Sequence, residues 1–235
     1  MITTILFDLD GTLLPMDQEQ FISAYLAGLT RKAAPHGYDP AKGPAAIWAG
    51  TKAMVKNDGS ATNEEVFWQT FSALCEKDAK QDIAIFEDFY RNEFQNIRTV
   101  CGFDPRAAEA IAEIKAMGFR VALATNPLFP AIATHSRVRW AGLNPEDFDL
   151  ITTYEDSRHC KPNPVYYQDV MEALGVTAGE CVIVGNDVDE DMIAQTLGIR
   201  TFLLTDCVIN RYGTDIEQYP HGSFPELMAF IRGLK

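Results

Sequence analysis

The sequence has little of what membrane-spanning, secreted or zinc-binding chains need. None of its apolar runs approaches the roughly 18 residues of a membrane helix. The first residues carry no basic cluster, and Asp8 and Asp10 interrupt the apolar run, so we expect no secretory signal. The five cysteines lie far apart without a CxxC pair, and the histidines do not cluster. This pattern predicts a reduced, cytoplasmic protein that holds no zinc.

Positive charge is also scarce. The chain has 33 Asp plus Glu against 20 Lys plus Arg, a formal net charge of -13. Such a balance repels phosphate backbones and anionic lipid surfaces, so we expect neither nucleic acid nor a membrane as a partner. A chain this acidic can still act on a small anion if it recruits a cation. Its 47% of hydrophobic residues are enough to bury a sizeable core.

Short apolar runs alternate with stretches of helical spacing. The runs typical of buried strands are Thr4–Phe7, Arg120–Ala124, Cys181–Val184 and Arg200–Leu204, with Asp149–Thr153 as a weaker fifth. The helical stretches are Pro105–Met117, Pro130–Ala141, Pro164–Leu174, Glu190–Leu197 and a short one at Phe224–Ile231. The alternation predicts an α/β fold, a doubly wound, Rossmann-like parallel sheet covered on both faces. Ligands of such sheets lie beyond the carboxyl ends of the strands.

Residues 16–98 break this alternation. The segment contains four helix-like stretches, Gln18–Ala33, Pro44–Lys56, Glu64–Lys77 and Ile83–Phe94, and nothing typical of a strand. Thr62 or Asn63 is the expected N-cap of the third stretch. The pattern predicts a helical domain of residues 16–98, inserted into an α/β domain formed by residues 1–15 and 99–235.

Asp8 and Asp10 directly follow the first predicted strand. Side chains alternate along a strand, so these two carboxylates face the same small space. Leaving both ionised is costly unless a cation lies between them or one carries a proton. Either arrangement suits a nucleophile, assisted by a metal or by a general acid. Gly11 and Thr12 add a turn whose backbone amides could hold an anion. Two aspartates with this spacing, taken alone, more often cap a turn. The residues at the other strand ends therefore decide between a cap and a catalytic site.

Polar side chains also follow the later predicted strands. Thr125 and Asn126 offer a hydroxyl and an amide at a strand end, although alone they would more often cap a helix. Two prolines fix the backbone around Lys161. A lysine held in place suits neutralising a carboxylate pair and a bound phosphoryl group, whereas a free surface lysine is the usual default.

The strand at Cys181–Val184 runs into a dense acidic cluster. Its oxygen ligands suit Mg²⁺, and we assign the metal to Asn186 and Asp187. Glu190 and Asp191 also suit the N-terminus of a helix. The four strand ends together supply a nucleophile, a general acid, an oxyanion donor, a counter-charge and a hard cation. This set predicts phosphoryl transfer to an aspartate.

Four ordered motifs carry a family resemblance. They are DLDGTL at Asp8–Leu13, ATN at Ala124–Asn126, KPNP at Lys161–Pro164 and GNDVDED at Gly185–Asp191. As an ordered set they resemble the haloacid dehalogenase superfamily. The resemblance covers residues 1–15 and about 99–205, and the helical insert resembles the family's α-helical C1 cap in position and character only.

The resemblance implies a role for several residues. Asp8 would be the nucleophile, Asp10 the general acid and base, Thr125 a donor to a phosphate oxygen, and Lys161 the cation that steadies Asp8 and the phosphoryl group. The expected substrate-binding residues are Gly11, Thr12, Thr125, Asn126 and Lys161. The resemblance also implies a Mg²⁺ ion held by Asp8, the backbone carbonyl of Asp10 and the fourth motif.

The fourth motif departs from the family pattern. Many members place Asp directly after the Gly, whereas this chain has Asn186 there and Asp187 next. Either Asn186 ligates the metal or Asp187 takes over, and we favour Asn186 because the strand end aims it into the pocket. We expect Asp191 to lie just behind the metal ligands.

The general acid narrows the expected activity. Dehalogenation needs no acid to protonate an alkoxide leaving group and no metal, so Asp10 favours a phosphatase or a phosphomutase. We expect a Mg²⁺-dependent phosphomonoester hydrolase of small phosphorylated metabolites that acts through a phosphoaspartate. A phosphomutase with the same residues and a catalytically weak binding or regulatory protein are the alternatives. Lys52, Lys56 and Arg91 are candidates to meet a second anionic group of the substrate, although a solvated surface side chain is the usual default for such residues.

Overall fold

The sheet is parallel throughout. The structure, a computed structural model, describes residues 1–234. Five strands pair in the order β2-β1-β3-β4-β5. They are β1 (Thr4–Phe7), β2 (Arg120–Leu123), β3 (Cys181–Gly185), β4 (Arg200–Leu204) and β5 (His221–Gly222). The predicted α/β fold with a parallel sheet is confirmed.

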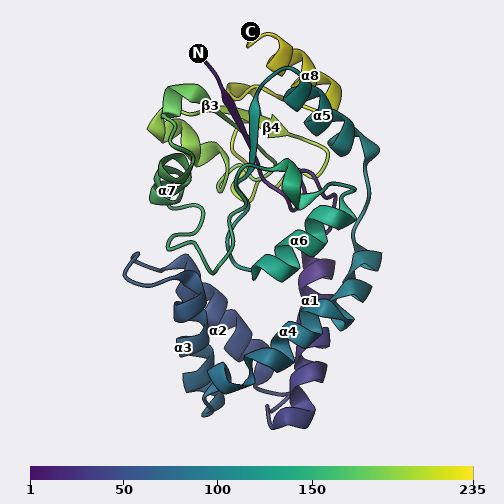
Figure 1. Ribbon diagram of the computed structural model, residues 1–235, viewed down its shortest axis with the longest axis vertical. Helices are drawn as coiled ribbons and strands as arrows, with labels where there is room; N and C mark the ends of the chain where they lie inside the picture. The colour runs from purple at the N-terminus through teal and green to yellow at the C-terminus, as the bar shows by residue number, and fades with distance from the viewer. Residues whose placement is uncertain (235) are drawn as a thin grey trace.

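Helices cover both faces of the sheet and form a separate layer at one end (Figure 1). After β1 come α1 (Gln18–Ala33), η1 (Ala34–His36), α2 (Gly43–Val55), α3 (Asn63–Cys75), η2 (Ala79–Asp82), α4 (Ile83–Arg91) and η3 (Glu93–Val100). The rest of the chain contributes α5 (Pro105–Ala116), α6 (Ala131–Trp140), η4 (Pro145–Asp147), α7 (Pro164–Leu174), η5 (Ala178–Glu180), η6 (Met192–Leu197), η7 (Ile216–Gln218) and α8 (Phe224–Arg232). Across residues 1–234, no helix is both long and apolar enough to span a bilayer.

The alternation of side chains along β1 explains why both faces are covered. Ile5 and Phe7 belong to a large hydrophobic cluster that includes residues of α5 and α8. Leu6 points the other way, into a smaller cluster with residues of α7. All three side chains are fully buried, as in a strand with helices on both sides.

The helical segment between β1 and β2 shares the larger cluster with the sheet. Aromatic rings make the junction: Phe94 of η3 stacks on Trp140 of α6 with centroids 5.0 Å apart. Tyr25 and Phe21 of α1 meet Phe129, which follows β2, at 5.1 and 6.0 Å. Thr62 caps α3 with a reciprocal bond to Glu65, as one of the two expected N-caps. The division into two domains at residues 16–98 stays a prediction.

Two predicted elements are wrong. Asp149–Thr153 is no strand, since it lies beside β2 with a single bridge between Leu123 and Ile151 before the chain turns away at residues 154–156. Glu190–Leu197 is no α-helix but the 3-10 helix η6, which starts at Met192. The Asp187 side chain accepts the amides of residues 189 and 190, and this turn delays the helix.

The strand order places the expected site. β1 has β2 on one side and β3 on the other, so the connections around β1 lead to opposite sides of the sheet. A crevice forms at such a switch point, at the carboxyl ends of the strands, and ligands bind there. Asp8 and Asp10 follow β1, while Asn186 and Asp187 follow β3, so both pairs flank this crevice.

Candidate active site

The predicted residues gather at one cavity of about 330 Å³. Its lining residues on the sheet side include Asp8, Asp10, Thr125, Asn126, Lys161, Asn186, Asp187 and Asp191. The opposite wall comes from the start of the helical segment and from the loop after β2. Gly11 and Thr12 lie behind this lining. The sheet therefore brings together side chains up to 183 positions apart, from Asp8 to Asp191.

A buried lysine joins the first and last motifs. Lys161 Nζ donates to Asp8 Oδ1 at 2.9 Å and to Asp191 Oδ1 at 2.6 Å, and the Lys161 side chain is only 1% exposed. Asp191 is pinned further, because its Oδ2 accepts the Asp187 amide at 3.0 Å. A Cβ at Gly185 would lie 2.1 Å from Asp191 Oδ2, so only glycine lets this carboxylate approach the end of β3.

Burial sets the protonation behaviour of this trio. Desolvation raises the pKa of Asp8 to about 7, helped by the nearby Asp191 and Asp10 carboxylates and opposed by Lys161. Burial alone would lower the pKa of Lys161, but Asp191 and Asp8 outweigh it and raise that pKa well above its ordinary value. Lys161 therefore stays an ammonium, while Asp8 needs more positive charge to be fully ionised at neutral pH.

The Thr12 hydroxyl lies beside two oxygens, one of which belongs to the Asp8 carboxylate that needs positive charge. Thr12 Oγ1 lies 2.9 Å from Asn186 Oδ1 and 3.3 Å from Asp8 Oδ2, yet it has a single proton to donate. Asn186 is oriented by its Nδ2, which donates to the Cys207 carbonyl at 2.7 Å. Gly11 has φ +88°, and a Cβ there would lie 2.3 Å from Asn186 Nδ2. Two oxygens that could hold a cation thus lie beside one hydroxyl at this side of the cavity.

The amides of the turn are placed differently from the expectation. The Gly11 and Thr12 backbone N–H groups donate to the Leu14 and Leu9 carbonyls at 2.8 and 3.1 Å. These two amides are engaged inside the turn and are not free to hold an anion. The side chain of Thr12 reaches the site instead, through Asp8 and Asn186.

Thr125 and Asn126 have different surroundings. The Thr125 carbonyl accepts from Thr152 Oγ1 at 2.6 Å and from the Tyr166 hydroxyl at 2.9 Å, which fixes the backbone at the end of β2. Thr125 and Asn126 both line the cavity, and the Asn126 amide also bonds to the Lys161 backbone and to Glu190. Asn126 therefore holds the loop that carries Lys161.

Arg137 is the main residue that the motifs missed. It lies on α6 with a fully buried side chain, and its Nη1 contacts Asp10 Oδ2. The guanidinium lies 4.4 Å from the centroid of the Phe129 ring and donates through Nη2 to Thr134 Oγ1. The available sequence signal was that Arg137 follows the apolar Ala133 by four residues and so lies on the same face of the helix. A charged side chain on a buried face needs a partner, and this would have pointed to an ion pair.

Two further charged residues line the cavity. Glu190 is mostly desolvated, and burial followed by the neighbouring Asp187 raises the pKa of Glu190 to about 7. Arg211 Nη1 donates to Asp187 Oδ2 at 2.6 Å. Arg211 lies in the loop after β4, outside every motif, so only the tertiary structure brings it to this site.

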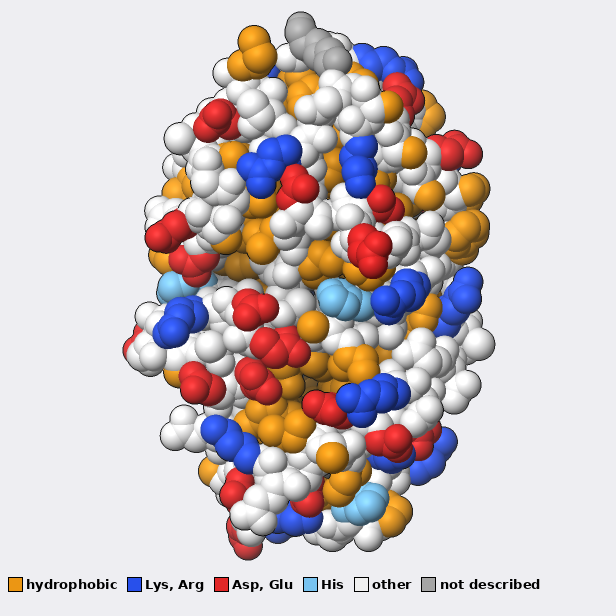
Figure 2. All heavy atoms as spheres, in the orientation of Figure 1, with side chains coloured by type: hydrophobic (Ala, Val, Ile, Leu, Met, Phe, Trp, Pro, Cys, Tyr) orange, Lys and Arg blue, Asp and Glu red, His pale blue; other side chains and the backbone are white. Residues whose placement is uncertain are grey.

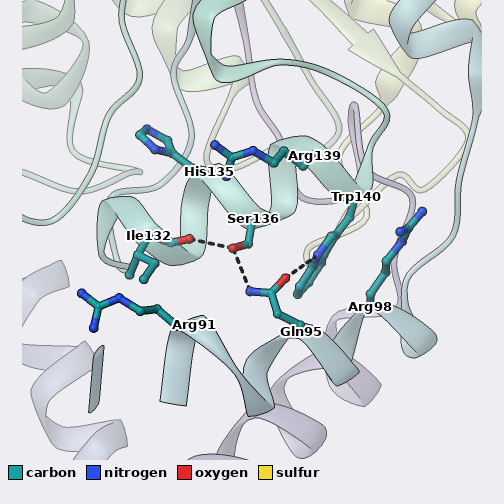
Figure 3. A pocket seen from close by; sticks show the side chains of 8 residues that line it. All are labelled: Arg91, Gln95, Arg98, Ile132, His135, Ser136, Arg139 and Trp140. Carbon is teal, nitrogen blue, oxygen red and sulfur yellow. Dashed lines mark hydrogen bonds between the residues drawn. The ribbon is translucent and has the colours of Figure 1, made fainter. Parts of the chain in front are cut away.

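A second cleft lies between α6 and the end of the helical segment, away from the motifs (Figure 3). Four of its lining residues are basic, namely Arg91, Arg98, His135 and Arg139. Its floor is a chain of hydrogen bonds in which Trp140 Nε1 donates to Gln95 Oε1 and Gln95 Nε2 donates to Ser136 Oγ. These bonds hold η3 against α6, so the cleft marks a junction between the helical segment and the helix that follows β2.

The comparisons with known proteins agree with this architecture. The model of the haloacid dehalogenase-like hydrolase family matches residues 2–195, and the chain belongs to this family. Pyrophosphatase PpaX of Bacillus velezensis is 24% identical over 200 residues, covering 85% of this chain and 82% of the relative. A phosphoglycolate phosphatase of Colwellia psychrerythraea is 27% identical over 232 residues, covering 98% and 96%.

A solved structure shows the same fold. It is a phosphatase of the haloacid dehalogenase type from Thermococcus onnurineus, with a TM-score of 0.64, 19% identity and 99% of each chain covered. The match of the family model confirms the family predicted from the four motifs, and the chain is a hydrolase of that family. The role of each site residue is still a prediction.

The Asp10–Arg137 pair generates a prediction about stability. Asp10→Ala leaves the guanidinium buried without a counter-charge, and we expect it to lower the free energy of unfolding by about 3 kcal/mol. Removing the other partner, in Arg137→Met, should lower the free energy of unfolding less. The Asp10 side chain that this variant leaves unpaired is 22% exposed, so water can solvate it. Urea unfolding followed by circular dichroism measures both. Adding Arg137→Met to Asp10→Ala should recover much of the loss, and an Asp10→Ala variant as stable as the wild type would contradict this account.

Proposed function

We propose that the protein is a Mg²⁺-dependent phosphomonoester hydrolase that acts through a phosphoaspartate on Asp8. The observation that carries the proposal is the Asp8 carboxylate itself, held by Lys161 and Thr12 at the switch point of the sheet. Asp10 and Thr125 line the same cavity. The phosphatase and pyrophosphatase names of the relatives support the same chemistry.

The proposed reaction has two steps. A carboxylate oxygen of Asp8 attacks phosphorus, the bond from phosphorus to the ester oxygen breaks, and Asp10 gives that oxygen its proton. Water then attacks phosphorus while Asp10 takes its proton, the bond from phosphorus to the Asp8 oxygen breaks, and inorganic phosphate leaves with the Asp8 carboxylate restored. Lys161 balances the negative charge on Asp8 and the phosphoryl oxygens, and Thr125 donates to one of them.

The residues of the site fit a hard cation. Asp8 Oδ2 and Asn186 Oδ1 share one hydroxyl donor, and the pKa of Asp8, raised to about 7 by burial, calls for a positive charge beside it. Oxygen donors of this kind suit Mg²⁺. No group of three His, Cys, Asp or Glu within residues 1–234 has the arrangement of a metal site, so an amide or backbone oxygen must complete the set. Bound there, Mg²⁺ would neutralise charge on the phosphoryl oxygens.

The hydrogen bonds favour Asn186 over Asp187 as the side chain that meets the metal. Asp187 Oδ1 accepts the amides of Asp189 and Glu190, and its Oδ2 accepts from Arg211. Asn186 Oδ1 accepts only from Thr12 and keeps a lone pair. We therefore propose Asp8, the Asp10 carbonyl and Asn186 as ligands, with Asp191 behind them holding Lys161.

We further propose that residues 16–98 act as a cap domain. Gln18, Ile22 and Trp48 of this segment line the cavity together with the motif residues. A cap in this place would enclose the substrate and exclude bulk water during proton transfer by Asp10.

Asp8→Asn tests the nucleophile. The change keeps the shape of the side chain and removes the attacking oxygen anion. Because enzymes accelerate phosphate-monoester hydrolysis by up to about 10²¹-fold, we expect no measurable release of phosphate from p-nitrophenyl phosphate. Asp149→Asn, an exposed aspartate outside the cavity, is the matched control and should stay active. Substantial turnover by purified Asp8→Asn would overturn the assignment.

Asp10→Asn tests proton transfer. General acid catalysis contributes typically ~10²–10⁴-fold and matters less when the leaving group is a weak base. We expect kcat/KM to decrease much more for an alkyl phosphate than for p-nitrophenyl phosphate. The ratio of the two substrates, measured on one preparation, is independent of how much of the variant is folded. Equal losses on both would show that Asp10 serves position or metal binding only.

Removal of the metal tests the proposed dependence on Mg²⁺ and the proposed ligand Asn186. Activity should vanish with EDTA and return with Mg²⁺. In Asn186→Ala we expect the Mg²⁺ concentration for half-maximal activity to rise by roughly tenfold or more, and in Asp187→Ala to change less. The increase in melting temperature on adding Mg²⁺ should likewise be lost in Asn186→Ala. Full activity in EDTA, or the same Mg²⁺ requirement in both variants and the wild type, is incompatible with this site.

A further inference from the structure

The wall of the cavity that faces away from the motifs is apolar. Helices α1 and α2, residue Met16 just before α1, and the loop after β2 supply it. Its side chains are Met16, Phe21, Ile22, Trp48, Val55, Leu128 and Phe129, with Gln18 and Thr51 as the polar members. Trp48 is 50% exposed and Val55 38% exposed, so large apolar side chains stand open to solvent around this wall. Exposed apolar surface inside a cleft is typical of a ligand site.

The cations of the cavity are already paired. Lys161 bonds to two carboxylates, and Arg211 bonds to Asp187. Within residues 1–234 no other Lys or Arg lines the cavity. Lys52, Lys56 and Arg91, the candidate contacts for a second anionic group, line neither this cavity nor the apolar one beside it. A carboxylate on the leaving group would find no free counter-charge here, and burying it would be costly.

An adjoining cavity of about 120 Å³ continues the apolar wall into the helical segment. The two cavities share Ile22, Trp48, Thr51, Leu128 and Phe129. The second is otherwise lined by Tyr25, Leu26, Ile47, Phe67, Trp68, Tyr90, Pro130 and Tyr154. Figure 2 shows hydrophobic side chains gathered around a hollow in the lower half of the molecule, where the helical segment lies.

The polar atoms of this second cavity bond to one another. The hydroxyls of Tyr25 and Tyr90 lie 2.9 Å apart, and Trp68 Nε1 donates to the Tyr154 hydroxyl at 3.3 Å. With these groups paired, the cavity presents rings and methyl groups to an occupant. An engineered apolar cavity of about 150 Å³ holds benzene, so a space of this size suits one ring or a short branched chain.

Building on the proposed function, we propose that the substrate is a phosphomonoester of an uncharged, apolar alcohol whose hydrocarbon group lies in the second cavity. The phosphoryl group would lie at Asp8, and the apolar group would extend past Trp48 and Phe129 toward Leu26. The product would be an uncharged alcohol with about one ring. The relatives are named for pyrophosphate and phosphoglycolate, and both of these substrates have charged leaving groups. The specificity proposed here is therefore different from the one in those names.

A panel of four alkyl phosphates tests the proposal through released phosphate. Benzyl phosphate, methyl phosphate, glycerol phosphate and phosphoglycolate are all esters of simple alcohols, so they compare the leaving group's shape and charge. We expect kcat/KM for benzyl phosphate to exceed that for methyl phosphate by at least about tenfold, as for a group that fills an apolar pocket. Phosphoglycolate should be the poorest of the four.

Leu26→Trp fills the second cavity and should lower the benzyl-to-methyl ratio of kcat/KM by about tenfold. Ala27→Trp places the same side chain at the next, exposed position of α1, outside both cavities, and should leave the ratio unchanged. Thr51→Lys is the second variant. It adds a cation where the cavities meet and should raise the rate with phosphoglycolate relative to benzyl phosphate. Each readout is a ratio and does not depend on the folded fraction.

The outcomes separate this inference from the proposed function. A preference for phosphoglycolate over benzyl phosphate, or equal ratios in Leu26→Trp and Ala27→Trp, would overturn the apolar specificity while leaving a working phosphatase. No phosphate release from any ester, p-nitrophenyl phosphate included, would overturn the proposed function and the inference with it.

Discussion

The buried ammonium of Lys161 holds the site together. It lies between the carboxylates of Asp8 and Asp191, and these follow two neighbouring strands of the sheet. Burying three charges is costly unless each is paired, so the loop that carries Lys161, the end of β1 and the turn after β3 must all keep their places. Asn126 fixes that loop, and Gly185 leaves room for Asp191. Strand pairing and charge pairing thus depend on one another.

A second buried charge ties the site to the helical segment. Arg137 contacts Asp10 from one side and lies over the ring of Phe129, which also meets Phe21 and Tyr25 of α1. The residue assigned to proton transfer therefore rests on the same aromatic cluster that joins the insert to the sheet. A change in how the helical segment packs would therefore shift the Arg137 guanidinium and alter its contact with Asp10.

Most of the fold could be predicted because its signals are local. Buried parallel strands are continuous apolar runs, so β1 and β4 were placed to the residue. Where strands pair through their backbones without an apolar run, the sequence does not indicate the strand. β5 consists of His221 and Gly222 and was missed, whereas Asp149–Thr153 has the composition of a strand but the chain leaves the sheet after one bridge. The predicted helix at Glu190 starts late because the Asp187 side chain accepts the amides of residues 189 and 190 and so forms a turn there.

The sequence by itself determined the family, the parallel sheet and the residues that meet at its edge, because three of the four motifs follow strand ends and parallel strands end on one side. Only the tertiary structure decided which partners these residues have. Arg137 and Arg211 come from a helix and a loop without any motif, the Gly11 and Thr12 amides are used inside their turn, and Asp187 is engaged by Arg211. The apolar wall is likewise a product of folding, since hydrophobic residues spread over two helices and a loop show no common site until they enclose one space.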